Sequence, residues 1–232
     1  MRTHDSIFAA ARMGAFARVL ACLSLLLALA TAPSAADAQP TPIAPLDADG
    51  PITYFIAEGA PGSMYRESDR ELALWALAAW RNAAGGAFEL AEAPEEDAIL
   101  RIYFVPASAG QYGEMRPIFV NGRRGAAVYV RPDVRALGPD IAGAALEDPL
   151  LRETIVYLTC VHELGHAFGL EHSSEYADIM YFFGYGGDIP GFFRRYREQL
   201  ESRDDIADFP GLSARDAARI ASLYARAADA KR

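Results

Sequence analysis

The sequence predicts an α/β or α+β domain with a mixed sheet. Strand-like segments and one well-marked helix make up the first half of the domain, and further helices follow in the second half, an order that favours a sheet covered by helices. The chain has 232 residues, of which 52% are hydrophobic and 23% charged. This is the composition of an ordinary globular protein, and the length allows one or two domains.

Residues 1–38 have the features of a cleavable secretory signal. A loosely basic segment precedes an apolar run from Val19 to Ala30, and a stretch of small residues ends at Ala38. The run is shorter than the roughly 20 apolar residues that span a bilayer. We therefore expect cleavage near Ala38, a secreted or periplasmic protein, and no stable membrane association after cleavage. An uncleaved N-terminal anchor is the alternative.

The rest of the chain reads as one domain behind a short linker. Residues 39–50 are rich in proline and small residues, which predicts an extended linker. Residues 51–232 form the predicted domain. We do not expect it to bind nucleic acid, because the chain carries a net charge of −9 and no basic patch with interleaved aromatic residues.

The first half of the domain predicts strands around one helix. The helix begins at Ser68, which with Glu71 has the spacing of a capping box, and ends at Gly85-Gly86. β-branched and aromatic residues predict the strands. The predicted strands cover 52–59, 87–93, 98–105 and, after a glycine-rich region at 109–125, the segment 126–130.

The second half predicts helices. Residues 133–148 are expected to form a surface connection, and a long helix follows from Pro149 to about Phe168. Residues 173–211 are expected to be mostly loop, with a short helix around 192–200. The final helix has a cap signal at Ser213 and Asp216.

Three of the four histidines fall within eleven residues of the long helix and its continuation. His162 and His166 are four residues apart, so their side chains lie on one face of a helix and can reach the same zinc ion. Gly169 can end the helix with a positive φ, which allows His172 to return to the ion as a third ligand. Glu163 is placed to reach a water at the open fourth position.

The segments HELGHAFGLEHSS, IMY and LSARDAARIASLYA together resemble the metzincin zinc proteases, and the matrixin-like branch most closely. The resemblance implies a metzincin-like zincin fold, with a twisted mixed sheet, an active-site helix and a small C-terminal subdomain. It also implies that Met180 forms an apolar floor beneath the histidines. Phe182 stands where some metzincins place a tyrosine ligand, so we expect a site of three histidines.

The predicted function is that of a secreted zinc metalloendopeptidase. In this interpretation Zn²⁺ is held by the three histidines and activates a water molecule, and Glu163 acts as the general base. The substrate is a protein or peptide, expected to lie along an edge strand near 126–130, and the enzyme is expected to be a monomer. The alternative is a secreted zinc-binding domain of the same fold that acts in binding, although zinc binding alone does not require Glu163. Ca²⁺ is an additional option, through Asp, Glu and carbonyl oxygens.

The helix pattern also indicates the role of Cys160. It lies two residues before His162, about 200° around the helix, on the side of several apolar residues. Cysteine is among the residue types most often buried. We therefore expect a buried structural thiol and no part in metal binding.

Overall fold

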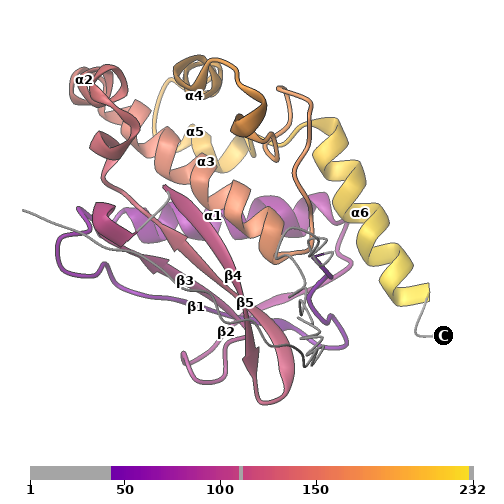
Figure 1. Ribbon diagram of the computed structural model, residues 1–232. Helices are drawn as coiled ribbons and strands as arrows, with labels where there is room; N and C mark the ends of the chain where they lie inside the picture. The colour runs from indigo at the N-terminus through magenta and orange to yellow at the C-terminus, as the bar shows by residue number, and fades with distance from the viewer. Residues whose placement is uncertain (1–42, 110–111, 230–232) are drawn as a thin grey trace, which may run out of the picture. The chain divides into compact units, whose positions relative to one another are not determined.

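A computed structural model of the chain describes residues 43–109 and 112–229 (Figure 1). The predicted signal at 1–38 and the first part of the predicted linker lie outside these ranges. Within them, no helix combines the length and the apolar character that crossing a membrane requires.

A five-stranded sheet forms the base of the described domain, with the strand order β2-β1-β3-β5-β4. Its strands are β1 (Ile52–Ile56), β2 (Leu90–Glu92), β3 (Leu100–Phe104), β4 (Gly113–Val120) and β5 (Arg123–Val130). Neighbouring pairs among β1, β2, β3 and β5 are parallel, whereas β4 runs antiparallel to β5 and occupies one edge. The predicted mixed α/β fold is therefore confirmed.

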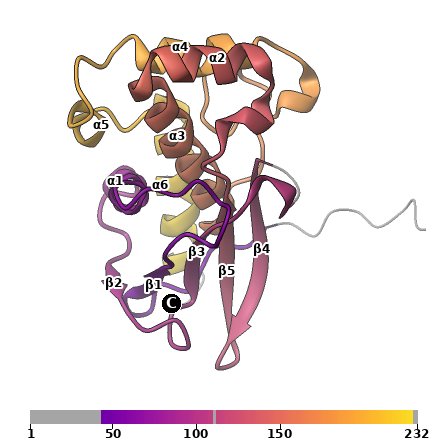
Figure 2. The same ribbon diagram turned by 90° about the vertical axis from the view of Figure 1, so that its left-hand side faces the viewer.

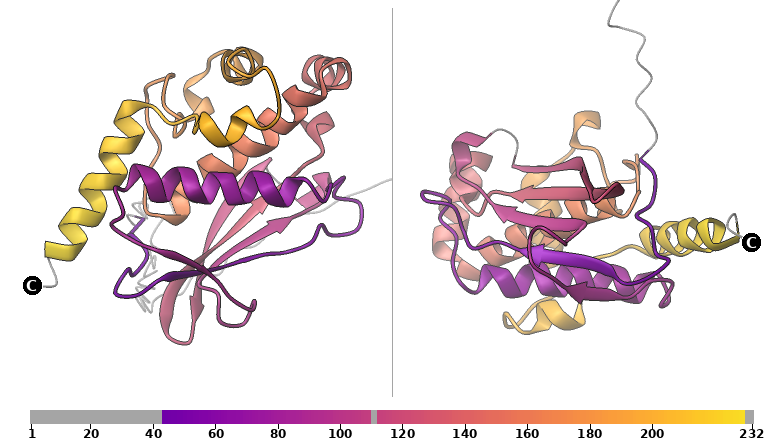
Figure 3. Two further views of the ribbon diagram at one scale, coloured as in Figure 1. Left: turned by 180° about the vertical axis from the view of Figure 1, so that it is seen from behind. Right: turned by 90° about the horizontal axis from the view of Figure 1, so that it is seen from below.

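Six α-helices accompany this sheet in the described ranges. They are α1 (Asp69–Ala83), α2 (Pro139–Glu147), α3 (Pro149–Ala167), α4 (Ile189–Arg197), α5 (Asp205–Asp208) and α6 (Ala214–Asp229). Short 3₁₀ turns occur at η2 (Ala107–Ala109), η3 (Val134–Leu137) and η4 (Phe183–Tyr185). The helices α1 and α3 pack against each other over one face of the sheet (Figures 1 and 2). Seen from below in Figure 3, the strands lie in front of these two helices.

The core lies between the sheet and the two long helices. Trp80 of α1 is fully buried, and its indole N–H donates a 2.8 Å hydrogen bond to the carbonyl of Val161 on α3. Ile102 and Val128 supply the facing surface of the sheet and are also fully buried. Cys160 has no exposed surface, as expected for a structural thiol. The helix that carries two histidines is thus held rigidly on the sheet.

The edge strand β4 corrects two expectations. No strand was predicted in the glycine-rich region at 109–125, and 126–130 was expected to be the edge strand along which substrate lies. In the structure β4 occupies 113–120 and covers that side of β5, so β5 is an interior strand between β3 and β4. Pro117 lies within β4, a position that proline tolerates only on an edge strand.

Two further expectations about helices were wrong. Residues 133–148 contain η3 and the helix α2 where a surface connection was expected. At the start of α1, Ser68 is itself in a helical conformation and makes no side-chain cap. The carboxylate of Asp69 instead accepts a 2.8 Å hydrogen bond from the N–H of Arg66, in the turn that precedes α1. The predicted short helix at 192–200 is present as α4, shifted toward the N-terminus.

Candidate metal centre

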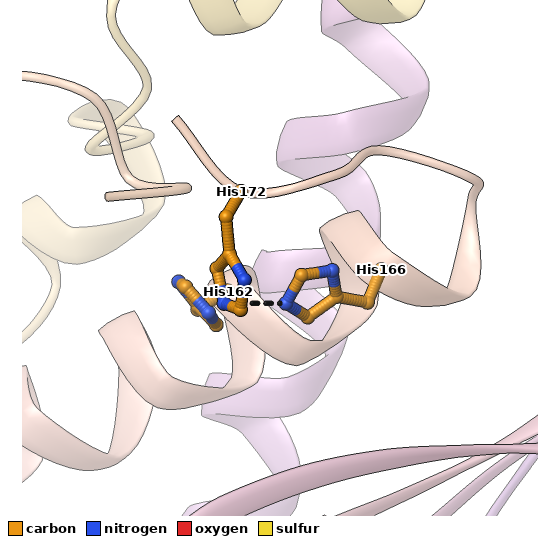
Figure 4. Close-up of side chains that lie close together, drawn as sticks. All are labelled: His162, His166 and His172. Atoms are coloured by element: carbon orange, nitrogen blue, oxygen red, sulfur yellow. Dashed lines mark hydrogen bonds between the residues drawn. The ribbon is translucent and has the colours of Figure 1, made fainter. Parts of the chain in front are cut away.

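The helix α3 positions the first two histidines. Asp148 caps its N-terminus by accepting hydrogen bonds from the N–H groups of Leu150 and Leu151. Further along this continuous helix of 19 residues, the side chains of His162 and His166 point to the same side, one turn apart (Figure 4). Their ring centroids lie 4.9 Å apart.

The chain leaves α3 through a glycine turn that returns the third histidine to the same place. Gly169 has a φ of +104°, in the region that favours glycine. The backbone of Pro45 also lies within 3 Å of where a Cβ on Gly169 would stand, so both the conformation and the space require glycine. His172 then reaches back over α3, and its Nε2 lies 3.2 Å from Nε2 of His166 (Figure 4).

Backbone carbonyls determine which ring nitrogens are free. The Nδ1 of His162 donates to the carbonyl of Ile179 at 2.7 Å, and the Nδ1 of His166 donates to the carbonyl of Leu170 at 2.8 Å. A carbonyl can only accept, so both rings carry their proton on Nδ1. Their Nε2 lone pairs are left free for a cation, an arrangement that recurs around metal-binding histidines.

The three rings fit a zinc ion. One nitrogen from each of His162, His166 and His172 can be chosen so that all three lie within 4.8 Å of one another. Two nitrogens at about 2.0–2.1 Å from a tetrahedral zinc ion would stand about 3.3–3.4 Å apart. The observed 3.2 Å between His166 and His172 is close to this value. Within the described residues these side chains therefore form a possible metal site.

Glu163 faces the start of the edge strand. Its side chain is buried and lies close to the backbone of Met115 in β4. A Cβ on Gly113 would stand 2.5 Å from Oε1 of Glu163 and 2.8 Å from Cγ2 of Thr159. The carboxylate thus occupies the space that a side chain at position 113 would fill.

Met180 lies against α3 between His162 and His166. The side chain is fully buried, and a Cβ on Gly165 would collide with its sulfur atom and stand 2.9 Å from the ring of Trp80. Gly165 lies between His162 and His166 on α3. The helix therefore rests on Met180 at the level of the two histidines.

The model of the matrixin family of M10 peptidases matches residues 47–186, which is more than half of the chain. The chain belongs to the matrixin family. Among curated proteins, none matches it. Matrixins bind zinc and are metalloproteases, so the family supports both the metal and the reaction class that the three histidines suggest.

Burial controls the charge of the histidines in this matrixin. It lowers the pKa of His162 to about 3, with help from the neighbouring His166, and that of His166 to about 4. Burial also lowers the pKa of His172, which is the most exposed of the three. A lowered pKa favours the neutral ring, so all three imidazoles are neutral at pH 7. Neutral rings are the form that binds a metal.

Burial also favours the uncharged form of Glu163 in this matrixin, which for a carboxyl group means a raised pKa. Burial, followed by the nearby Glu114, raises the pKa of Glu163 to about 8, while the backbone N–H of Met115 opposes the shift. Without a cation nearby, the buried carboxyl group therefore favours its protonated form. A carboxyl group with a raised pKa in a closed site is a common feature of acid–base catalysts.

Phe182 lies beside the third histidine. Its ring lies 4.7 Å from the ring of His172 and is partly exposed. It covers one side of the third histidine where a tyrosine would bring an oxygen.

Several residues that orient the site were not recognised from the sequence. The carbonyls of Leu170 and Ile179 hold two of the rings, and Gly113 makes room for Glu163. Arg219 of α6 donates a 2.6 Å hydrogen bond to the carbonyl of Glu171, next to His172. Backbone groups and long-range contacts leave no local pattern, so only the HExxHxxGxxH spacing pointed to the site.

Proposed function

We propose that this matrixin is a secreted zinc endopeptidase. The observation that carries the proposal is the convergence of three neutral imidazoles beside a buried glutamate on the same helix. Metal binding alone would require the histidines, whereas a carboxylate at position 163 adds the group that peptide hydrolysis needs.

The chain's own residues divide the chemistry between them. His162, His166 and His172 would hold the zinc ion, which when bound polarises the scissile carbonyl and lowers the pKa of water. Glu163 takes a proton from the attacking water on its carboxylate and returns it to the leaving amine. The carbonyls of Ile179 and Leu170 keep two rings in the correct tautomer throughout.

The edge strand β4 is the surface on which we expect the substrate to bind. No described strand pairs with its outer side, so an extended peptide can add to the sheet there through backbone hydrogen bonds. The first residues of β4, Gly113 and Met115, contact Glu163. A peptide paired with β4 would therefore pass close to the general base.

Secretion and the oligomeric state rest on sequence features. The basic, apolar and small-residue segments of 1–38 support export followed by cleavage near Ala38. A start near Gln39 in N-terminal sequencing of exported protein would support this and would rule out an uncleaved anchor. We propose a monomer that acts on proteins or peptides, and a calcium site stays a prediction.

Hydrolysis of a peptide library, followed by mass spectrometry, tests the proposed function. The expected result is internal cleavage that stops with a chelator and returns with zinc. Glu163→Gln should keep one zinc per chain and lose most of the turnover, by about 10²–10⁴-fold. Zinc bound with no cleavage of any peptide by the wild type would instead favour the alternative, a zinc-binding domain.

A further inference from the structure

A cavity of about 500 Å³ lies between α6 and the Gly169–Glu171 turn. None of the three histidines lines it. Its walls are formed by Ile43, the turn, and one face of α6: Gly169, Leu170, Glu171, Arg215, Ala218, Arg219, Ser222, Leu223 and Arg226. Figure 1 shows α6 running past the end of α3, where this turn lies. Cavities of this size hold small-molecule ligands.

The wall formed by α6 is strongly basic. Arg215, Arg219 and Arg226 are spaced by four and seven residues, so they share one face of the helix, and Ser222 lies between them. Glu171 is the acidic residue of the lining. Three guanidinium groups against one carboxylate contrast with the net charge of −9 for the whole chain.

The protein satisfies these arginines only in part. Arg219 donates through Nη2 to the carbonyl of Glu171, but its Nη1 is buried and has no hydrogen-bond partner. Arg226 has no ion pair or hydrogen bond with any described residue. Arg215 lies 3.5 Å from Glu175 and 3.6 Å from Asp178, at the long end of ion-pair distances.

We propose that this cavity binds an oxyanion, such as the phosphate or carboxylate group of a small molecule. The guanidinium groups of Arg215, Arg219 and Arg226 line the same cavity, so several N–H donors surround one space. Guanidinium groups bind carboxylates and phosphates through paired N–H donors. The hydroxyl of Ser222, on the same face, offers a further donor.

An anion in this cavity would be linked to the metal centre through Arg219. Arg219, which lines the cavity, also holds the carbonyl of Glu171, the residue before His172. A ligand that orders Arg219 therefore stabilises the turn that delivers the third histidine. The binding site itself does not depend on the proposed peptidase activity.

Isothermal titration calorimetry on the purified zinc-loaded protein tests the proposal. The probes are inorganic phosphate and succinate at constant ionic strength, with chloride as the reference anion. We expect saturable binding of one anion per chain, and binding of phosphate, succinate or both supports the site while identifying the preferred group. Arg226→Gln should weaken binding about tenfold and Arg219→Gln more strongly. Arg81→Gln, at an exposed arginine of α1, should leave the dissociation constant unchanged.

The variants distinguish phosphate bound in the cavity from phosphate bound by the zinc ion. Arg226 is exposed and lies seven residues along α6 from Arg219, which holds the histidine turn, so Arg226→Gln is expected to fold and to keep its zinc. Equal dissociation constants for the wild type and Arg226→Gln would overturn the proposal. So would the lack of saturable binding of both probes up to about 10 mM, a level at which only very weak association escapes detection.

Discussion

The carboxylate of Asp216 accepts a 2.8 Å hydrogen bond from the N–H of Ile179, and the carbonyl of Ile179 accepts the Nδ1–H of His162 at 2.7 Å. The C-terminal helix α6 thus holds the peptide segment that orients the first histidine. Asp216 also exchanges hydrogen bonds with Ser213, so the capping box predicted for this helix is confirmed.

Asp216→Ala is expected to weaken both the fold and the metal site. The change leaves the N–H of Ile179 and that of Ser213 without their buried acceptor, which costs about 1–3 kcal/mol per group in the free energy of unfolding. Loss of a group that orients a ligand typically weakens metal binding about 10–100-fold. Thermal denaturation and competitive zinc titration measure the two effects. The exposed Asp208→Ala is the control, and equal behaviour of the two variants would contradict the role of Asp216.

Gly113→Ala is expected to reduce turnover while zinc stays bound. The added methyl group would stand 2.5 Å from Oε1 of Glu163, so the carboxylate must move. Displacement of a catalytic group by about 1 Å can cost about 10²-fold in rate. Gly143→Ala in α2 is the matched control, because its new methyl group meets nothing within 4 Å. Steady-state kinetics measures the turnover of both variants, and metal analysis measures their bound zinc. Full activity in Gly113→Ala would show that Glu163 is not held as described.

The buried ion pair between Arg152 and Asp69 is expected to dominate the stability of the contact between α1 and α3. Arg152 Nη2 lies 2.8 Å from Asp69, and both side chains are almost completely buried. Arg152→Met leaves the buried carboxylate without its ionic partner and should cost about 3–5 kcal/mol. Arg135→Met breaks a pair whose arginine is 67% exposed and should cost less than about 1 kcal/mol. Urea denaturation compares them, and similar midpoints would refute this difference.

Cys160 is expected to be unreactive in the folded protein. Its side chain is fully buried on α3, and burial raises the pKa of its thiol, so the reactive thiolate is scarce even at pH 9. A thiol reagent should label this residue only after denaturation, and Cys160→Ala identifies the signal. Rapid labelling of native protein would mean that α3 opens at the level of the metal centre.

The local parts of this architecture could be predicted from sequence. The helix over Pro149–Ala167 and the convergence of His162, His166 and His172 follow from 3.6-residue periodicity and one glycine, which act over short distances. The strand β4 was missed because an exposed edge strand with a glycine and a proline lacks the alternation of a half-buried one. The helix α2 is short, and Gly143 near its middle weakens its pattern.

Long-range partners explain the remaining errors. Ser68 and Glu71 have capping-box spacing, but Ser68 makes no side-chain cap. The first residue of α1, Asp69, pairs with Arg152, which is 83 residues away. The wrong edge strand followed from missing β4. Contacts between distant segments, such as Arg219 with Glu171, leave no trace in local periodicity.

X-ray absorption spectroscopy of the purified, zinc-loaded protein tests the central claim most directly. The account predicts one zinc per chain with imidazole nitrogens at about 2.0–2.1 Å and no sulfur ligand, and His172→Ala should remove one of these imidazoles. A sulfur shell at about 2.3 Å, or a spectrum that His172→Ala leaves unchanged, would contradict it.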